Sequence, residues 1–363
     1  MKLLSAMSGG VDSSVATALA VKMGHSVTGV HMALMENRQL FNYGLRGCCS
    51  IEDSNDAARV AAQLEIPFYV WDLSKDFKNQ VVNDFVEQYK MGRTPNPCIR
   101  CNEFIKFQTL LQKSISFGFD GLITGHWAQI IDGNLYRAVN LAKDQSYVLA
   151  IMSSDILSKC FFPLGEYATK DEIRQLASDF GFEVKDKFES TDICFIKNGE
   201  TSEFLTNSIG DKTGDIINLS GEVLGQHKGY FHFTIGQRRG LNIKNPAFDG
   251  KPRYVLKTNP AANTVTVGTK QNLNVKQIIT KISSSHSQIV SSATKPIRCY
   301  VQIRAHSTPI KASAEKLKKN GYWKFTLAVP QKDGVADGQT LVAYRKDRTG
   351  DKVLGSWEIN NGA

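Results

Sequence analysis

The sequence lacks the features that mark membrane and secreted proteins. No apolar run among its 363 residues approaches the roughly 20 residues of a membrane span. The first seven residues are too few for a signal peptide, because a Gly-rich stretch follows at once. The chain has no internal repeat and no low-complexity tract. We therefore expect a globular, cytoplasmic protein that makes no contact with a membrane.

A disulfide framework and a structural zinc site are missing too. The seven cysteines form an odd set without the spacing of a secreted, disulfide-rich domain. Cys98 and Cys101 form a single Cys-x-x-Cys pair, and two thiolates cannot complete a structural zinc site. Four other cysteines are expected to be buried or to line a loop: Cys48, Cys49, Cys160 and Cys299.

Negative charge is scarce in the second half of the chain. Residues 1–205 hold 20 Lys and Arg against 25 Asp and Glu, whereas residues 206–363 hold 24 against 10. This asymmetry favours a polyanionic partner for the second half, and nucleic acid explains it better than a merely solubilising surface does. Charge alone does not identify that partner.

The first part of the chain alternates strand-like and helix-like segments with short connections. This order predicts an α/β domain with a parallel sheet covered by helices. The expected strands are Lys2–Met7, His25–Met35, Pro67–Leu73 and Gly121–Gly125, and the expected helices are Asp12–Met23, Ser54–Leu64, Phe77–Lys90, Glu103–Phe117 and Lys170–Phe180.

After about residue 205, short strand-like segments separated by Gly, Pro and Asn replace this pattern. They predict a small β-rich central domain followed by a C-terminal antiparallel β-barrel. The expected domains are residues 1–205, 206–275 and 276–363. The expected strands include Asp215–Leu219, Tyr230–Thr234, Arg253–Lys257, Thr264–Gly268, Ile297–Arg304, Trp323–Val329, Thr340–Tyr344 and Val353–Ile359.

The strongest local signal is Ser-Gly-Gly-Val-Asp-Ser-Ser at residues 8–14, between the first strand and the first helix. Gly9 and Gly10 let backbone N–H groups approach an anion, and the helix N-terminus adds a positive dipole end. The motif lacks the Gly-Lys-Ser/Thr ending of the common P-loop, which disfavours a kinase or a GTPase. Asp12 suits either Mg²⁺ or a helix cap. A plain Gly-rich turn with a helix cap is the alternative.

This pattern resembles the pyrophosphate-loop ATPases, which cleave ATP to AMP and pyrophosphate and adenylate an oxygen to make it a leaving group. The resemblance implies that the nucleotide contacts the loop, the end of the second strand and the residues after the fourth strand. The implied ATP-binding residues are Ala6, Met7, Ser8, Gly9, Gly10, Val11, Asp12, Ser13, Met32 and Gly125.

Two cysteine-containing segments are candidates for covalent chemistry. Cys98 and Cys101 follow the Pro-rich turn 94–97 near a helix N-terminus, where the helix dipole and Arg100 stabilise a thiolate. At positions i and i+3 they are expected to share one helix face, as a redox pair or as metal ligands. Cys194 supplies a third thiol, for which a buried apolar role is the simpler alternative.

Six motifs extend over nearly the whole chain. They are residues 8–14, Thr-Pro-Asn-Pro at 94–97 with Cys101-Asn102, Thr-Gly-His at 124–126, Lys-Asp-Gln-Ser-Tyr at 143–147, Ser-Thr-Asp-Ile-Cys-Phe at 190–195 and Thr-Ile-Gly-Gln-Arg-Arg-Gly-Leu at 234–241. Together they resemble the bacterial tRNA-specific 2-thiouridylases, which make 2-thiouridine at the wobble position of tRNA.

The resemblance implies ATP-dependent thiolation of uridine at C2, with Cys101 as the nucleophile and Cys194 as the carrier of a persulfide. It also implies an outside sulfur donor, such as a cysteine desulfurase or a sulfur-relay protein. The target base would meet Asn96, Pro97 and Cys98. The implied tRNA contacts are His126, Lys143, Asp144, Gln145, Arg304, Ala305 and Gln339.

Cys98 departs from the family pattern, in which many members carry Asp after Asn-Pro. Some relatives are thought to hold an iron–sulfur cluster in this region, and Cys98, Cys101 and Cys194 would be its ligands here. We favour the route without a cluster.

A basic and aromatic RNA-binding face is a further hypothesis. Its residues would be Lys228, Tyr230, Phe231, Phe233, Arg238 and Arg239, with an ordinary amphipathic strand pair as the alternative. Two rival functions also stay open. Another pyrophosphate-loop ligase or synthetase would not explain the basic second half, and an RNA- or metal-binding module would not explain the loop at residues 8–14.

Overall fold

The computed structural model describes residues 1–35, 51–187, 193–197, 199–241, 243, 250–283, 295–318 and 321–361. The chain forms two compact units, each assembled from three separate segments. The first unit contains residues 1–82, 97–198 and 345–354, and the second contains residues 83–96, 199–344 and 355–363. Cys48, Cys49 and residues 190–192 of the Cys194 motif lie outside the described residues.

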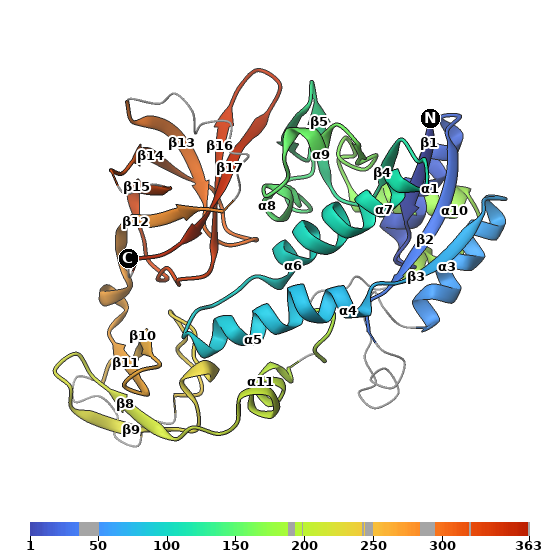
Figure 1. Ribbon diagram of the computed structural model, residues 1–363. Helices are drawn as coiled ribbons and strands as arrows, with labels where there is room; N and C mark the ends of the chain where they lie inside the picture. The colour runs from blue at the N-terminus through green and yellow to red at the C-terminus, as the bar shows by residue number, and fades with distance from the viewer. Residues whose placement is uncertain are drawn as a thin grey trace. The chain divides into compact units, whose positions relative to one another are not determined.

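The first unit is built on a five-stranded parallel sheet with the order β3-β2-β1-β4-β7 (Figure 1). Its strands are β1 (Lys2–Ala6), β2 (Ser26–Ala33), β3 (Phe68–Asp72), β4 (Gly121–Ile123) and β7 (Cys160–Phe161). Leu3 and Leu4 of β1 are both fully buried. Because consecutive strand residues point to opposite faces, both faces of the sheet are covered at this position.

Helices of the first unit pack around this sheet. They are α1 (Val11–Lys22), α3 (Ile51–Gln63), α4 (Ser74–Phe77), α6 (Pro97–Arg100), α7 (Leu111–Ser116), α8 (Ser146–Leu149), α9 (Ser154–Leu157), α10 (Lys170–Asp179) and the 3₁₀-helix η3 (Glu183–Asp186). Helix α1 packs against α10, and small side chains such as Ala16 and Ala177 are fully buried in their shared core. Small side chains take up little space between the two helices, so the helix axes can approach closely.

Two helical stretches contain π-helical turns, which are rare and frequently occur at functional sites. Helix α4 continues through the π-helix η1 (Lys78–Val82) into α5 (Asn83–Lys90). Helix α6 continues through the π-helix η2 (Cys101–Leu110) into α7. The predicted helix Glu103–Phe117 therefore begins earlier, at Pro97, so that both cysteines of the pair lie within it.

The second unit contains a four-stranded sheet, β10-β11-β8-β9, and a six-stranded antiparallel barrel that the pairing of β12 with β17 closes (Figure 1). The four strands of the sheet are β8 (Gly214–Ile217), β9 (Val223–His227), β10 (Tyr254–Asn259) and β11 (Thr264–Gly268). The barrel strands are β12 (Val275–Ile282), β13 (Ile297–Gln302), β14 (Ile310–Lys316), β15 (Tyr322–Gln331), β16 (Thr340–Lys346) and β17 (Asp351–Ile359). Helix α11 (Thr201–Ile209) and the 3₁₀-helices η4 (Tyr230–His232) and η5 (Lys270–Leu273) complete this unit.

A hairpin of the first unit, β5 (Ala128–Ile131) and β6 (Asn134–Arg137), turns at Gly133, which has a positive φ of 71°. The tip of the β16–β17 hairpin, residues 345–354, also belongs to the first unit. There Lys352 of β17 pairs with Tyr136 of β6. The C-terminal part of the chain therefore contributes a short segment to the first unit.

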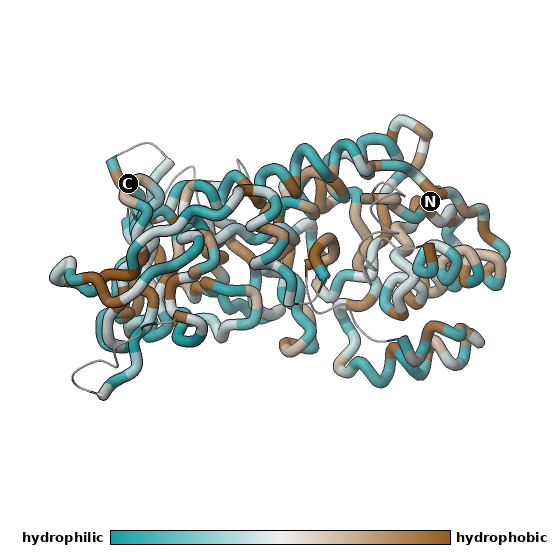
Figure 2. Tube along the Cα trace, turned by 90° about the horizontal axis from the view of Figure 1, so that it is seen from below, coloured by the Kyte–Doolittle hydropathy of each residue, from teal (hydrophilic) through white to brown (hydrophobic). Residues whose placement is uncertain are grey.

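The predicted fold class is confirmed: a parallel α/β part, a small β-rich part and a C-terminal barrel follow one another. The predicted strand Tyr230–Thr234 is wrong, because Tyr230–His232 form a 3₁₀-helix. The domain boundaries at residues 205 and 275 stay predictions. No helix within the described ranges is long and apolar enough to cross a membrane, and Figure 2 shows apolar residues interleaved with polar ones along the helices.

Candidate active site

The sheet order identifies where a ligand would bind in the first unit. Strands β2 and β3 lie on one side of β1, and β4 and β7 lie on the other. The strand order therefore changes direction between β1 and β4, and ligands of open α/β sheets bind at the carboxyl ends of the strands at such a point. The loop at residues 7–14 follows β1, and Gly125 follows β4. The structure thus brings these two predicted ATP-binding segments together.

The phosphate loop, residues 7–14, is held by short local hydrogen bonds. The Ser8 backbone N–H donates to the Ser13 hydroxyl at 3.1 Å, and that hydroxyl donates to the Gly10 carbonyl at 3.0 Å. The Ser14 hydroxyl donates to the same carbonyl at 3.0 Å. Gly9 has φ of 74°, and a Cβ there would lie 2.2 Å from the Asp53 carbonyl oxygen. Only glycine fits this position, for reasons of both conformation and space.

The N-terminus of α1 suits an anion. Gly10 is the N-cap residue and makes no side-chain cap hydrogen bond, so that no side chain of the cap covers the first turn. The first N–H groups of a helix have no partner within the helix, and the helix dipole adds positive potential there. A polyphosphate fits this cradle, which supports nucleotide binding at the loop.

The carboxylate of Asp12, predicted to hold Mg²⁺, forms an ion pair with the Lys170 ammonium at 2.6 Å. The Asp12 side chain is 32% exposed. Lys170 thus balances the charge of this carboxylate. Mg²⁺ binding at Asp12 stays a prediction, and a metal ion there would have to share the carboxylate with Lys170.

The other predicted nucleotide contacts differ in how they could act. The side chains of Ala6, Met7 and Val11 are buried in the core, so that only their backbone groups can face a ligand. Met32 is half-buried at the end of β2. Gly125 lies against the first turn of α1, where a Cβ would be 2.6 Å from the Ser13 nitrogen. A larger residue at Gly125 would therefore displace the loop.

Lys187 is a residue at this site that sequence reasoning missed. Its ammonium donates to the Gly9 carbonyl at 3.1 Å, to Asp53 at 2.6 Å and to Asp56 at 2.5 Å. Although burial disfavours its charged form, hydrogen bonds to the two carboxylates raise the pKa of Lys187 above its ordinary value. Lys187 therefore connects the phosphate loop to α3 as a permanent cation. No pattern near residue 187 could have shown this, since both aspartates lie more than 100 positions away.

The two cysteines of the pair differ in exposure. Cys98 is exposed, whereas Cys101, the first residue of η2, is buried. The helix changes from α to π at Cys101, and the prediction that the two cysteines share one helix face stays a prediction. Arg100, predicted to add positive charge, is paired with Glu103 at 3.0 Å, which reduces its effect on a nearby thiol.

Cys194 is half-exposed and lies in a short described segment of the first unit. Its neighbour Phe195 is buried and contacts Phe77 of α4 edge to face, with ring centroids 5.6 Å apart. Helix α4 also packs against η2, the helix that begins with Cys101. The same group of helices therefore anchors the segments that carry Cys194 and Cys101.

His126, a predicted tRNA contact, is buried. Its Nδ1 lies 2.7 Å from the Thr124 hydroxyl, and its Nε2 lies 3.5 Å from the Lys106 ammonium. Burial lowers the pKa of His126 well below its usual value, and the charge of Lys106 lowers it further. The imidazole is therefore neutral, with Nε2 accepting from Lys106 and Nδ1 donating to Thr124.

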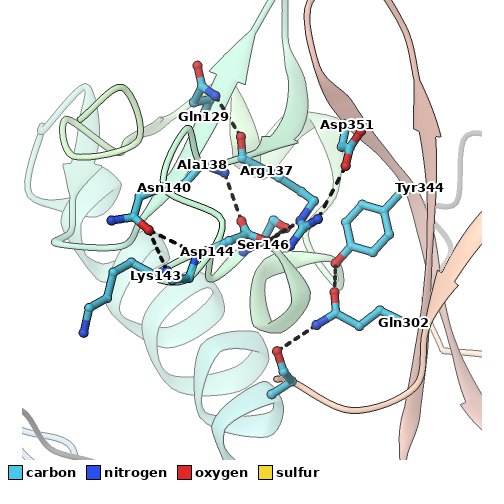
Figure 3. Close-up of polar contacts among 12 residues, drawn as sticks. Gln129, Arg137, Ala138, Asn140, Lys143, Asp144, Ser146, Gln302, Tyr344 and Asp351 are labelled. Carbon is cyan, nitrogen blue, oxygen red and sulfur yellow. Dashed lines mark hydrogen bonds and ion pairs between the residues drawn. The ribbon is translucent and has the colours of Figure 1, made fainter. Parts of the chain in front are cut away.

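The predicted tRNA contacts at residues 143–145 surround a buried ion pair (Figure 3). The Asp144 carboxylate accepts from Arg137 at 2.7 Å, from the Ala138 N–H at 3.0 Å and from the Ser146 hydroxyl at 2.9 Å. Only 2% of the Asp144 side chain is exposed. This carboxylate therefore positions the turn, and a contact of its oxygens with RNA would require these bonds to break.

Arg137 also reaches Asp351 at 3.4 Å, in the segment of the β16–β17 hairpin that belongs to the first unit. The Gln145 side chain accepts from the Trp127 N–H at 2.9 Å. The Lys143 side chain, in contrast, extends away from the cluster in Figure 3. Of the three predicted contacts, Gln145 is exposed, Lys143 is half-exposed, and the Asp144 side chain is buried. Arg137 is a positioning residue that the sequence did not reveal.

In the second unit, Gln302 holds the turn at residues 304–305. Its amide donates to the carbonyls of Arg304 at 3.1 Å and Ala305 at 2.7 Å, and its carbonyl accepts from the Tyr344 hydroxyl at 3.0 Å (Figure 3). The Arg304 guanidinium donates to the Asp333 carbonyl at 3.0 Å. Gln339 donates to the Thr94 carbonyl at 2.7 Å, and this hydrogen bond connects the barrel to the segment before Asn96.

The predicted aromatic RNA-binding face is wrong. Its three aromatic residues, Tyr230, Phe231 and Phe233, are 2–9% exposed and cannot present their rings to bases. The basic residues of this group are exposed, so they could still bind phosphates: Lys228, Arg238 and Arg239.

No group of three or more His, Cys, Asp or Glu side chains among the described residues could hold a metal ion. Cys98, Cys101 and Cys194 all belong to the described residues, so that their arrangement does not fit an iron–sulfur cluster. No step that follows involves such a cluster.

Family models match three successive parts of the chain. The tRNA methyl transferase HUP domain matches residues 1–198, the tRNA methyl transferase PRC-barrel domain residues 202–269, and the aminomethyltransferase beta-barrel domain residues 275–359. A solved 4-thiouridine synthetase–RNA complex with bound ATP is 17% identical, with a TM-score of 0.33 over 57% of this chain and 50% of that chain. Likeness this loose does not identify a function.

Curated relatives are far more similar. The tRNA-specific 2-thiouridylase MnmA of Salinispora tropica is 48% identical, covering 99% of this chain and 99% of the relative. The protein of the same name from Streptomyces avermitilis is 50% identical, covering 99% and 94%. The one from Rhodococcus jostii is 48% identical, covering 99% and 98%. The chain belongs to the tRNA-specific 2-thiouridylase family.

Proposed function

We infer that the protein is a tRNA-uridine 2-sulfurtransferase that uses ATP to replace the oxygen at C2 of a tRNA uridine with sulfur. The family and the fold support this function. The single observation that carries it is that one compact unit holds a phosphate loop at the switch point of its sheet together with the segments of Cys101 and Cys194. The finer assignments that follow, including the wobble position, are part of the proposal.

In the first step, the base oxygen becomes a leaving group. The C2 oxygen of uracil attacks the α-phosphate of ATP and pyrophosphate leaves, so that the base carries AMP on that oxygen. The backbone N–H groups of the phosphate loop and the α1 dipole stabilise the negative charge on the phosphates. Mg²⁺, with Asp12 as a candidate ligand, would share this task.

In the second step, sulfur replaces the activated oxygen. A persulfide on Cys194, loaded by an outside sulfur donor, attacks C2 with its terminal sulfur, and AMP leaves. The Cys101 thiolate then attacks the inner sulfur of Cys194. The sulfur–sulfur bond of the persulfide breaks, the terminal sulfur stays on the base, and a Cys101–Cys194 disulfide forms. A two-electron thiol reductant must reduce that disulfide before the next cycle.

The remaining assignments describe how tRNA is held. Asn96, Pro97 and Cys98 would contact the target base, which must leave its stack to reach the phosphate loop. Lys143 and Arg304 suit phosphates, and the basic second half suits the tRNA body. We propose the domain division 1–205, 206–275 and 276–363 for ATP, tRNA and barrel functions, and a cytoplasmic location. The sulfur donor would be a cysteine desulfurase or a sulfur-relay protein.

Sulfur transfer from a persulfide donor to unmodified tRNA tests the proposal. We expect Cys101→Ser and Cys194→Ser to lower 2-thiouridine formation by at least about a thousandfold, since each removes a covalent step. ATP affinity should stay unchanged. Cys160→Ser is the matched control, because burial raises the pKa of the Cys160 thiol and makes it unreactive. Full activity in both active-site variants would remove the proposed chemistry.

Two alternatives have separate tests. ATP–pyrophosphate exchange in the absence of tRNA would favour a pyrophosphate-loop ligase that acts on a small molecule. An iron–sulfur-dependent form of the same reaction predicts that Cys98→Asp loses activity together with bound iron. The persulfide route predicts that Cys98→Asp keeps measurable activity, because Cys98 forms no covalent bond in that route.

A further inference from the structure

The segment before the predicted base pocket combines local backbone hydrogen bonds at residues 91–93 with contacts to remote residues. We call residues 90–96, which connect α5 to α6, the strap. All of them belong to the second unit. The Tyr230 hydroxyl donates to the Lys90 carbonyl at 2.6 Å, and the Thr258 hydroxyl donates to the Gly92 carbonyl at 2.9 Å. The central β-rich part of the chain therefore fixes the start of the strap.

The C-terminal barrel holds the next two residues of the strap. The Thr94 N–H donates to the Asp337 carbonyl at 2.8 Å, and the Thr94 carbonyl accepts from the Gln339 amide at 2.7 Å. Arg93 forms an ion pair with Glu358 of β17. The two side chains are only 22% and 27% exposed, so that water screens the pair less than a surface pair. Both backbone polar groups of Thr94 thus bond to the barrel.

Close packing and proline make this connection stiff. Gly338 has φ of 86°, and a Cβ there would lie 3.1 Å from the Arg93 Cβ and 3.2 Å from the Thr94 nitrogen. Pro95 and Pro97 fix their own φ angles and restrict the residues before them. A displacement of Thr94 would therefore reach Asn96, the first residue of the predicted base pocket, rather than being absorbed by a flexible linker.

The same barrel loop also holds a predicted tRNA contact. The β15–β16 loop, residues 332–339, accepts a hydrogen bond from the Arg304 guanidinium at the Asp333 carbonyl. At its other end, this loop provides Asp337 and Gln339 to the strap. One short loop thus contacts both Arg304 and Thr94, within a single compact unit.

We propose that Arg93, Glu358 and Gln339 are positioning residues through which the C-terminal barrel sets the place of the target-base loop. The inference rests on the proposed function, because it takes residues 96–98 as the base pocket. Transfer of sulfur then depends on the barrel, whereas ATP binding depends only on the phosphate loop of the first unit. The barrel serves as the reference against which the base is presented, in addition to holding tRNA.

Charge reversal at the Arg93–Glu358 pair tests the proposal. The measurements are single-turnover 2-thiouridine formation at saturating ATP and tRNA, the Kd values of both ligands, and the melting temperature. We expect Arg93→Glu and Glu358→Arg each to lower the rate at least tenfold while both Kd values stay within twofold. The double variant should restore the rate to within threefold of wild type. Glu87→Lys, which reverses one charge of the exposed Lys90–Glu87 pair, is the control and should leave the rate unchanged.

Several results would overturn the proposal. One is a wild-type rate in both single variants, and another is a double variant that regains the melting temperature but not the rate. An equal loss of ATP affinity and rate would also count against it, since a general structural role predicts that pattern. If the reversals do not fold, Glu358→Gln removes the charge alone, and an unchanged rate there sinks the inference. A wild-type protein that forms no 2-thiouridine would instead contradict the proposed function itself.

Discussion

The phosphate loop and the strap are both short, irregular segments at the candidate active site, but they are held in opposite ways. Three hydrogen bonds inside the phosphate loop connect residues three to five positions apart, and Lys187 adds a remote one. The strap has local backbone hydrogen bonds only at residues 91–93, and its other contacts reach partners 140 to 265 positions away. The first is thus a local structure that its own sequence largely determines. The second takes its position from the tertiary fold.

This difference suggests a division of labour. A phosphate loop must present the same N–H groups to every nucleotide, and local hydrogen bonds suit that purpose because they do not depend on distant parts of the chain. The strap leads to the predicted base pocket, and its remote partners connect it to the central β-rich part and the barrel of the second unit. Local hydrogen bonds would then position the loop for ATP, and remote contacts would position the segment for the base.

The largest effect is expected from a substitution in the phosphate loop, the locally held segment of this comparison. Gly9→Ala should lower ATP affinity about a hundredfold and cost about 3 kcal/mol of stability, because the new Cβ meets the Asp53 backbone in a left-handed conformation. Titration with ATP and urea unfolding measure the two effects. Gly24→Ala is the control, since φ is 83° there but no atom lies within 4 Å. It should cost only about 1 kcal/mol.

If Gly9→Ala binds ATP like wild type, the loop is not the nucleotide cradle. If the two glycine variants lose the same stability, the close approach to Asp53 contributes nothing, and the conformational requirement alone explains Gly9.

The next effect concerns the buried ion pair that holds the turn at residues 143–145 in the first unit. Arg137→Met should cost about 3 kcal/mol, because it leaves Asp144 and Asp351 without their cation, and Asp144 is almost fully buried. The turn at residues 143–145 would loosen, and we expect the KM for tRNA to rise about tenfold with the KM for ATP unchanged. Lys90→Met, at an exposed pair, should change stability by less than about 1 kcal/mol. An unchanged KM for tRNA would show that the turn does not contact tRNA.

How much of the molecule the sequence predicts follows from the same distinction. The spacing of apolar residues, together with the Gly, Pro and Asn residues between segments, predicted the parallel sheet and the barrel strands, because both depend on local sequence patterns. The Gly9–Gly10 motif predicted the phosphate loop for the same reason. The strand predicted at Tyr230 failed because its aromatic residues are buried in a 3₁₀ turn, a tertiary packing choice that overrides strand propensity.

The residues that sequence reasoning missed at the site are those with remote partners. Lys187, Arg137 and Gln302 occupy no recognisable motif, and each has at least one partner that only the fold brings near: Gly9, Asp351 and Tyr344, respectively. The π-helical start of η2 was missed as well, because helical periodicity does not distinguish an α-helix from a π-helix at this length. These are effects of packing, and one-dimensional patterns do not contain them.

A smaller effect sharpens the comparison, because it tests the remote contact of the otherwise local phosphate loop. Lys187→Met should raise the KM for ATP about fivefold by freeing the Gly9 carbonyl and leaving Asp53 and Asp56 uncompensated near the phosphates. Lys187→Arg should recover part of the affinity. Lys185→Met, at an exposed neighbour on the same short helix, is the control. Equal KM values in all three variants would mean that local hydrogen bonds hold the loop without help.

The smallest effect is a dependence of stability on pH at His126, beside the phosphate loop. Burial holds the pKa of His126 below its ordinary value of about 6.5, so that the folded state binds fewer protons than the unfolded state as pH falls. Stability is therefore fully present above pH 6.5 and should fall by about 1 kcal/mol between pH 6.5 and 5.5. His126→Gln should remove that part of the slope, whereas His227 and His232, whose pKa values burial also lowers, keep the rest. Urea unfolding of both proteins across this range measures the difference. Parallel pH profiles would contradict the prediction, because they would mean that the pKa of His126 is the same in the folded and the unfolded protein.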